Sequence, residues 1–247
     1  AVSGTALTIA AQNYEAPACG SGSDSTTCTV IVTATDAAGT ATQQTITVTI
    51  TDVNDQTPAV TVAATYSHAE AAATTFQTYT IVDTDTAGAY TCTLGGDDAA
   101  DFTRSITGKV CTVSWAANPN YEAPADADTD NVYDITIAFS DGTNDLGAQT
   151  TAITVTDVNE APVVANAIAD ATTNEDSSYT LSLSNVFSDV DSGDSCTYSM
   201  SGAPGTLTLS SGTISGTPTN ANVGTHTITV SCSDGALSVS DQYVLTV

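Results

Sequence analysis

The sequence predicts an all-β chain made of tandem β-sandwiches. Runs in which Ile or Val alternates with Thr, such as 45–50 and 152–156, are typical of strands with one buried face. Turn residues separate such runs at short intervals, and no run has helical periodicity. The motif Asp-Val-Asn-Asp at 52–55 returns as Asp-Val-Asn-Glu at 157–160, roughly a hundred residues later, which indicates a repeated domain.

The first predicted segment, residues 1–54, resembles the second half of a sandwich. It holds a strand at 6–9, a turn at 13–17, a Gly/Ser-rich loop at 20–27, and two long strands at 28–35 and 42–51. Strands that would cover the apolar face of this pair do not precede them in the sequence. Either the chain is a fragment, or another subunit completes the fold by strand addition.

The second predicted segment, residues 55–160, repeats this pattern and adds a front half. The turn Asn-Tyr-Glu-Ala-Pro recurs at 120–124, and the front half contributes strands near 59–66, 74–82 and 89–95. Residues 161–247 form a third unit. Its Asp-Val-Asp at 189–191 and Ser-Asp-Gly at 233–235 correspond to Asp-Thr-Asp at 83–85 and Ser-Asp-Gly at 140–142.

Composition excludes several classes of partner. The chain has 2 Lys+Arg against 28 Asp+Glu, for a net charge of −26. Nucleic acid and anionic membrane surfaces are excluded, because nothing could neutralise their phosphates. The same charge repels itself in the folded state, so we expect bound divalent cations or high salt to offset it.

The six cysteines indicate an oxidising environment. They fall two in each predicted segment, none lies in a Cys-x-x-Cys pair, and His is too scarce for a zinc site. We therefore expect the disulfides Cys19–Cys28, Cys92–Cys111 and Cys196–Cys232, and an extracellular or cell-surface location. No signal peptide or transmembrane run is apparent, as expected for a mature secreted part or a piece of a longer polypeptide.

The two repeated motifs follow strands at points where Ca²⁺ could bind. Each places carboxylates and an Asn directly after an alternating run, and then Pro58 or Pro162 stiffens the exit. Ca²⁺ takes six to eight oxygen ligands from carboxylates, Asn side chains and backbone carbonyls. We interpret both stretches as calcium-binding joints between domains.

Four motifs in the same order and repeated, Asn-Tyr-Glu, Ser-Asp-Gly, Asp-Val-Asn-Asp and Asp-x-Asp, make the chain resemble tandem cadherin repeats. Segments 1–54 and 55–160 resemble cadherin domains. Segment 161–247, with its motifs at 185–191 and 212–218, resembles the dystroglycan-type cadherin-like or Ig-like domain of bacterial and archaeal surface proteins. The resemblance implies Greek-key β-sandwiches of the cadherin and Ig-like type, the first incomplete in this chain.

The resemblance also implies two sets of calcium ligands. For the first joint the set is Asn13, Glu15, Asp52, Val53, Asn54, Asp55, Gln56, Asp83, Asp85 and Asp141, with Val53 and Gln56 contributing carbonyls. For the second joint the set is Glu70, Asn120, Glu122, Asp157, Asn159, Glu160, Asp189, Asp191 and Asp234. Asn13 and Asn120 stand where cadherins usually carry Asp, and Glu160 replaces the usual Asp. Solvated turn residues are the alternative, although turn chemistry does not require matching sets.

A separate acidic loop lies at 126–130, with the sequence Asp-Ala-Asp-Thr-Asp. It could hold an additional ion, but a solvated loop is the simpler interpretation.

Nothing in the sequence indicates an enzyme. No nucleophile elbow, phosphate loop or His-Glu-x-x-His motif is present, and we expect His68 and His226 at surface or edge positions and Trp115 in the core. The predicted function is a structural or adhesive cell-surface array, such as a stalk, adhesin or filament subunit, stiffened by Ca²⁺. Its partners would be copies of itself or a cell-surface ligand, and its Thr-rich faces could carry O-glycans. The alternative is a non-catalytic carbohydrate- or protein-binding module of a larger surface-layer protein or secreted enzyme.

Overall fold

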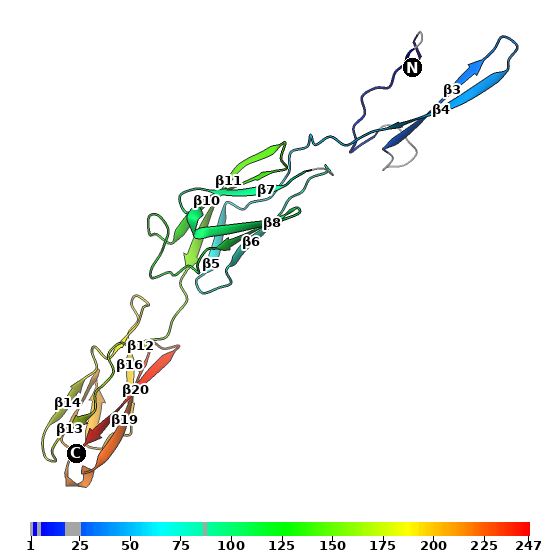
Figure 1. The fold of residues 1–247 in the computed structure, drawn as a ribbon. Helices are drawn as coiled ribbons and strands as arrows, with labels where there is room; N and C mark the ends of the chain where they lie inside the picture. Colours follow the sequence, from blue (N-terminus) through cyan, green and yellow to red (C-terminus); the bar gives the residue numbers. More distant parts are fainter. Residues whose placement is uncertain (1, 4–5, 18–25, 86–87) are drawn as a thin grey trace. The chain divides into compact units, whose positions relative to one another are not determined.

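A computed structural model describes all residues except 1, 4–5, 18–25 and 86–87. The regular secondary structure of the described chain is almost entirely β-strand (Figure 1). It divides into two compact units: residues 1–119 with 125–155, and residues 120–124 with 156–247. The predicted three-part division at 54 and 160 stays a prediction.

Unit 1 begins with two small sheets. The short strands β1 (Val2–Ser3) and β2 (Ala6–Leu7) pair with each other, and β3 (Thr27–Thr35) and β4 (Ala41–Thr49) form a regular antiparallel hairpin. The hairpin confirms the two long predicted strands. On the face that carries Val30, Val32 and Ile46, Ile46 is 37% exposed and the two valines are only half-buried, as the sequence predicts for an unclosed sandwich.

Two further sheets of unit 1 form a β-sandwich. One has the strand order β5-β11-β10-β7 and the other β6-β9-β8. The first sheet comprises β5 (Thr65–Ala69), β7 (Thr91–Gly95), β10 (Val132–Ser140) and β11 (Asp145–Thr156). The second comprises β6 (Thr75–Thr80), β8 (Phe102–Thr107) and β9 (Val110–Trp115), and a 3-10 turn, η1 (Ala99–Asp101), precedes β8.

The core of this sandwich follows from strict alternation along β10. Ile135, Ile137 and Phe139 are fully buried between the sheets, while the residues between them are not. They pack with side chains of the other sheet, including Trp115, which is 4% exposed and confirms its predicted place in the core. The predicted disulfide Cys92–Cys111 joins β7 to β9 and therefore links the two sheets.

The predicted strand at 59–66 is wrong in its extent. Regular pairing begins only at Thr65, and the preceding stretch makes a single bridge between Ala59 and Val82. Val60 and Val62 still pack against the core. The alternation of apolar residues here therefore reflects burial of one face of the segment. A segment can be buried in this way without forming regular strand pairing.

Unit 2 contains a second β-sandwich. One sheet has the order β13-β20-β19-β16 and comprises β13 (Ala171–Thr172), β16 (Thr197–Ser201), β19 (Thr225–Ser233) and β20 (Ser238–Thr246). The opposing sheet, β14-β18-β17, comprises β14 (Tyr179–Ser182), β17 (Leu207–Ser210) and β18 (Thr213–Gly216). Two short strands, β12 (Val163–Val164) and β15 (Phe187–Ser188), pair at one edge, and η2 (Asn220–Asn222) precedes β19. All described pairings here are antiparallel except that of β13 with β20.

The core of unit 2 lies between these sheets. Ile228 and Val230 from β19, Leu245 from β20 and Ile214 from β18 are fully buried. Cys196–Cys232 is the second predicted disulfide that the structure confirms. Cys28 is also disulfide-bonded, but its predicted partner Cys19 lies outside the described residues. In the part of the chain that the structure describes, no helix has the length and apolar character needed to cross a bilayer.

Candidate metal centres

Carboxylates gather where the strands of unit 1 end. Asp141 directly follows β10, and Asp83 and Asp85 come shortly after β6. One carboxylate oxygen from each of these three residues lies within 4.8 Å of the others. Asp85 and Asp141 are each 1% exposed, so two of the three negative charges are largely removed from bulk water. Unpaired buried charges are costly, which makes this group a candidate cation site.

A second group in unit 1 shares Asp85. Glu15, Asp52 and Asp85 also bring one carboxylate oxygen each within 4.8 Å of one another. The backbone N–H of Gln56 donates to Asp85 Oδ2 at 2.9 Å. Asp85 therefore connects the exit of the β3–β4 hairpin with the turn that follows β6.

Several oxygens in these groups lack a donor. Among the described residues, none donates a hydrogen bond to the buried atoms Glu15 Oε1, Asp83 Oδ2 or Asp85 Oδ1. Native proteins rarely leave buried polar atoms unpaired, and a missing ion is one explanation where it occurs. Carboxylate oxygens are the ligands that Ca²⁺ prefers, so these residues fit the predicted ion.

The shape of the Ser-Asp-Gly turn explains how Asp141 is held. Its Oδ1 accepts hydrogen bonds from the backbone N–H groups of Thr143 and Asn144, both at 2.7 Å. Gly142 has φ +94°, a left-handed conformation that other residues rarely adopt. Burial alone would raise the pKa of Asp141, but these donors outweigh it, so its pKa is lowered and the carboxylate stays ionised.

Asn144 is a site residue that the sequence did not reveal. Its Nδ2 lies 3.0 Å from Asn54 Oδ1, 3.1 Å from the Gln56 carbonyl and 3.2 Å from Asp141 Oδ2. This amide ties the motif at 52–56 to the loop after β10. The sequence signal that could have identified Asn144 is its position three residues after Asp141, in the same turn.

Other members of the first predicted set lie at a neighbouring pocket. Asn13, Glu15, Val53 and Asp55 all line it. Asn13 Oδ1 accepts from the Glu15 N–H at 3.0 Å, and Asp55 Oδ1 accepts from Gln56 Nε2 at 2.9 Å. The Val53 side chain is a hydrocarbon, so only the carbonyl of this residue could serve as a ligand.

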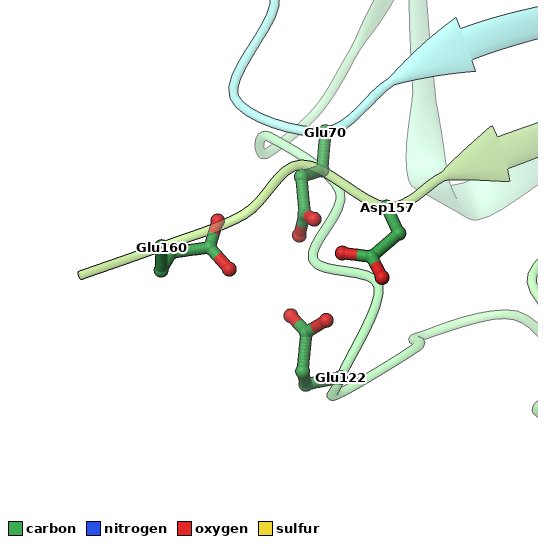
Figure 2. A group of neighbouring side chains, drawn as sticks. All are labelled: Glu70, Glu122, Asp157 and Glu160. Carbon is green, nitrogen blue, oxygen red and sulfur yellow. The ribbon is translucent and has the colours of Figure 1, made fainter. Parts of the chain in front are cut away.

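Four members of the second predicted set also lie together. Figure 2 shows the carboxylates of Glu70, Glu122, Asp157 and Glu160 facing a common point, with one oxygen of each within 4.8 Å of the others. Glu70 directly follows β5 and is 4% exposed, while Asp157 directly follows β11. Asn120 instead accepts a hydrogen bond from the Ala123 N–H at 2.8 Å within its own turn.

The remaining members lie within unit 2 and repeat the local arrangement of unit 1. The Glu160 N–H donates to Asp191 Oδ2 at 2.9 Å, as Gln56 does to Asp85. The Asp191 N–H donates to Asp189 Oδ1 at 3.2 Å, as Asp85 does to Asp83 at 3.0 Å. Asn159 Nδ2 donates to Asp234 Oδ2 at 3.1 Å.

Asp234 is held by the same turn as Asp141. Its Oδ1 accepts from the N–H groups of Leu237 and Ala236, at 2.7 and 2.6 Å, and these donors lower its pKa. Gly235 has φ +112°. Asp194 joins Asp189 and Asp234 in a group of carboxylate oxygens within 4.8 Å, and the sequence reasoning missed it.

The described chain thus consists of β-sandwiches with a cadherin-like and Ig-like fold, and acidic groups lie where several of their strands end. Residues 161–247 match the family model described as "Putative Ig domain". A comparison of the sequence with curated proteins found no match.

Several solved cadherin ectodomains resemble this chain. The first three domains of protocadherin gamma C5 superpose with a TM-score of 0.50 at 18% identity, covering 90% of this chain and 78% of that one. Mouse cadherin-23 domains 22–24 give a TM-score of 0.46 at 19% identity, covering 89% and 73%. The human desmocollin-1 ectodomain gives 0.48 at 15% identity, and this chain spans 46% of its length. At these identities the likeness shows the fold alone.

Proposed function

We propose that this chain is part of a non-catalytic, extracellular structural or adhesive array whose domains are stiffened by Ca²⁺. The observation that carries the proposal is the pair of carboxylate groups sharing Asp85. They draw on residues near 15, 52, 84 and 141, which are far apart in the sequence. A solvated turn has no need to collect carboxylates from such distant positions.

Repulsion within these groups explains how the ion would act. Two negative charges about 4 Å apart repel by roughly 1 kcal/mol in water, and by more where water is excluded. Ca²⁺ held by Glu15, Asp52, Asp83, Asp85 and Asp141 would supply positive charge there. The Asp85–Gln56 and Asn144–Asn54 hydrogen bonds would then fix the exit of the hairpin against the sandwich.

Corresponding contacts in unit 2 support a second site of the same kind. Asp189, Asp191 and Asp234 carry the same turn hydrogen bonds as Asp83, Asp85 and Asp141. Asp191 Oδ1 is buried and accepts nothing from any described residue. We propose that these three residues and Asp194 also hold Ca²⁺.

The disulfides support an extracellular location, because such bonds persist in oxidising compartments. Extracellular calcium modules bind weakly, with dissociation constants of about 10⁻⁴–10⁻³ M. The array would therefore be stiff only outside the cell, where calcium is plentiful. Of the large hydrophobic residues that are exposed in the described part of the chain, only Tyr121 is aromatic. No exposed aromatic patch is therefore seen among these residues, and this favours a structural role over sugar binding.

Small-angle scattering in EDTA and then in millimolar Ca²⁺ tests the proposal. We expect the maximum dimension to increase and the distribution of distances to narrow when Ca²⁺ is added. Asp85→Asn should weaken this response, whereas Asp97→Asn, which removes one exposed charge outside the groups, should retain it. An unchanged profile of the unmodified chain would show that the carboxylates are surface charge.

A further inference from the structure

The acidic loop 126–130 shares no residue with the candidate centres described above. It precedes β10, on the stretch that connects β9 to that strand. Two buried carboxylates are associated with it: Asp98 and Asp126, which are 4% and 3% exposed. Both carboxylate oxygens of Asp98 accept hydrogen bonds, whereas only one oxygen of Asp126 accepts one from a described residue.

Asp98 has a complete structural role. Its Oδ1 accepts from the Ala127 N–H at 2.7 Å, and its Oδ2 accepts from the Asp134 N–H at 2.6 Å. These two bonds attach the loop to the start of β10. Both oxygens of Asp98 are thus satisfied by the protein alone.

Asp126 is satisfied on one side only. Its Oδ2 accepts from the Asp130 N–H at 2.8 Å, so the carboxylate is directed at the following turn. Its Oδ1 is also buried, yet no donor from the described residues reaches it. Leaving a buried charged oxygen unpaired carries the full cost of its desolvation.

The turn brings two more carboxylates to the same place. One oxygen each from Asp126, Asp128 and Asp130 lies within 4.8 Å of the others. Asp130 Oδ1 accepts from the Val132 N–H at 2.8 Å, and the Asp128 side chain is exposed to solvent. Thr129 and Asn131 adopt left-handed φ angles of 61° and 65°, unusual for residues other than Gly.

Basic side chains that could compensate this charge are scarce. The chain has only Arg104 and Lys109, and the Lys109 ammonium donates to the Asp83 carbonyl at 2.8 Å. Nearby, burial raises the pKa of Asp101, with the Asp98 and Asp126 carboxylates adding to the effect. The loop thus gathers three carboxylates, with Asp98 and Asp101 nearby, in a chain that has two basic side chains.

We propose that loop 126–130 binds a divalent hard cation, Ca²⁺, through the carboxylates of Asp126, Asp128 and Asp130. The ligands are oxygens without His or Cys, which suits Ca²⁺ rather than zinc. Asp126 Oδ1 gains a partner, and the exposed Asp128 gains a function. This site shares no residue with the other centres. All three ligands belong to the stretch just before β10, so the ion would hold this loop of unit 1.

Nuclear magnetic resonance of the full chain tests the proposal. During titration with Ca²⁺ into metal-free protein, the amide resonances of residues 127–131 should shift and saturate. They should do so in Asp85→Asn as well, because that residue belongs to other centres. In Asp128→Asn the Ca²⁺ concentration at the midpoint of the titration should rise by about 10–100-fold. Metal affinity falls by this factor even when the group lost only orients a ligand.

Asp134→Asn is the matched control, since it removes an exposed carboxylate beside the loop that is outside the group. Its loop resonances should titrate as in the unmodified chain. The proposal fails if the amides of 127–131 do not respond to Ca²⁺, or if Asp128→Asn and Asp134→Asn change the midpoint equally. A response at 53–56 without one at 127–131 would overturn this site alone, and the reverse would overturn the proposed calcium joint alone.

Discussion

Asp85 is the residue on which the acidic groups of unit 1 converge. It is 1% exposed, contributes to two groups, and accepts the Gln56 N–H. Asn at this position could still accept that hydrogen bond, so a substitution isolates the charge. Its role is therefore open to a direct test.

Asp85→Asn should have opposite effects with and without Ca²⁺. At about 10 mM Ca²⁺, a hundredfold above a dissociation constant of ~10⁻⁴ M, one site that binds only the folded state adds about 2.7 kcal/mol to stability. The variant should lose most of that contribution. In EDTA it should be at least as stable as the unmodified chain, because one repelling charge is gone.

Thermal unfolding in both buffers measures this difference, with Asp97→Asn as the control for general charge removal. Equal destabilisation of Asp85→Asn in EDTA and in Ca²⁺ would contradict the prediction, since it would show a purely structural role.

Asp141 should make stability depend on acid pH. Its folded-state pKa is lowered, so its contribution is complete above the unfolded-state value of about 3.9 and is lost as pH falls through the folded-state pKa. In calcium-free protein, the free energy of unfolding lost in Asp141→Asn should be constant from pH 7 to about 5 and shrink below about pH 4. Chemical denaturation across this range provides the measurement. A difference that grows towards low pH would have the wrong sign.

Most residues of the candidate centres were among those predicted from the sequence, but two residues that contact or join them were not. Asp85, Asp141 and Asp234 were predicted because matching motifs recur. Asn144 and Asp194 were missed, because their roles arise from the fold of a turn and from packing between loops. Such contacts leave no repeated pattern along the chain.

At the scale of single elements, the Ser-Asp-Gly turns are the most reproducible feature. In both units the aspartate accepts two backbone N–H groups from residues two and three positions later. The sequence could predict this local structure, because Asp and Gly determine the turn. The sequence could not place the start of β5. Val60 and Val62 are separated by one polar residue and pack against the core, and the same pattern is expected of a paired strand.

The Cys92–Cys111 disulfide should be a major contribution to the stability of the unit 1 sandwich. It closes a loop with a sequence separation of 19 and joins one sheet to the other. Constraining a loop of this size in the unfolded chain is worth about 3 kcal/mol. We expect the double variant Cys92→Ala/Cys111→Ala to lose about that much, measured by denaturant unfolding of unit 1 with Trp115 fluorescence.

Unit 2 provides the comparison for that experiment. Cys196→Ala/Cys232→Ala should leave the Trp115 transition unchanged, because Trp115 belongs to the core of unit 1. A loss of stability of the same size in both variants would show that the fluorescence does not report on one sandwich.

For the whole molecule, the dominant property is a net charge of −26 with two basic residues. Without Ca²⁺, the stability should rise with NaCl, because the screening length falls from about 10 Å at 0.1 M to about 3 Å at 1 M. We expect the unfolding temperature in EDTA to rise by at least about 2–4 °C, which corresponds to roughly 1 kcal/mol in a chain of this size.

In saturating Ca²⁺ the same salt series should have a smaller effect, since bound ions already reduce the repulsion. Calorimetric scans of both series give the comparison. If salt affects the loaded and unloaded protein equally, the charge is distributed over the surface and the acidic groups contribute little to it.

The fold class was predictable at this scale because alternation and turns recur throughout the chain. Ile153 and Val155 of the alternating run at 152–156 are buried as that alternation predicts, and both described disulfides match the predicted pairs. The meaning of loop 126–130 was not predictable. Only the fold shows that Asp98 is satisfied and that Asp126 is not.

The parallel pairing of β13 with β20 has a mechanical consequence. Ala171 and Thr172 lie beside Leu245 and Thr246, and the Thr173 N–H donates to the Thr246 carbonyl at 2.9 Å. A pull applied at residue 161 and at Val247 would slide these strands along each other, so their hydrogen bonds would be loaded together rather than opened one at a time. Two further hydrogen bonds join the same two segments. The Val244 N–H donates to Asp170 Oδ1, and the Ile168 N–H donates to Asp241 Oδ2. We therefore expect this domain to resist tension applied at these two points better than a domain whose terminal strands are antiparallel neighbours.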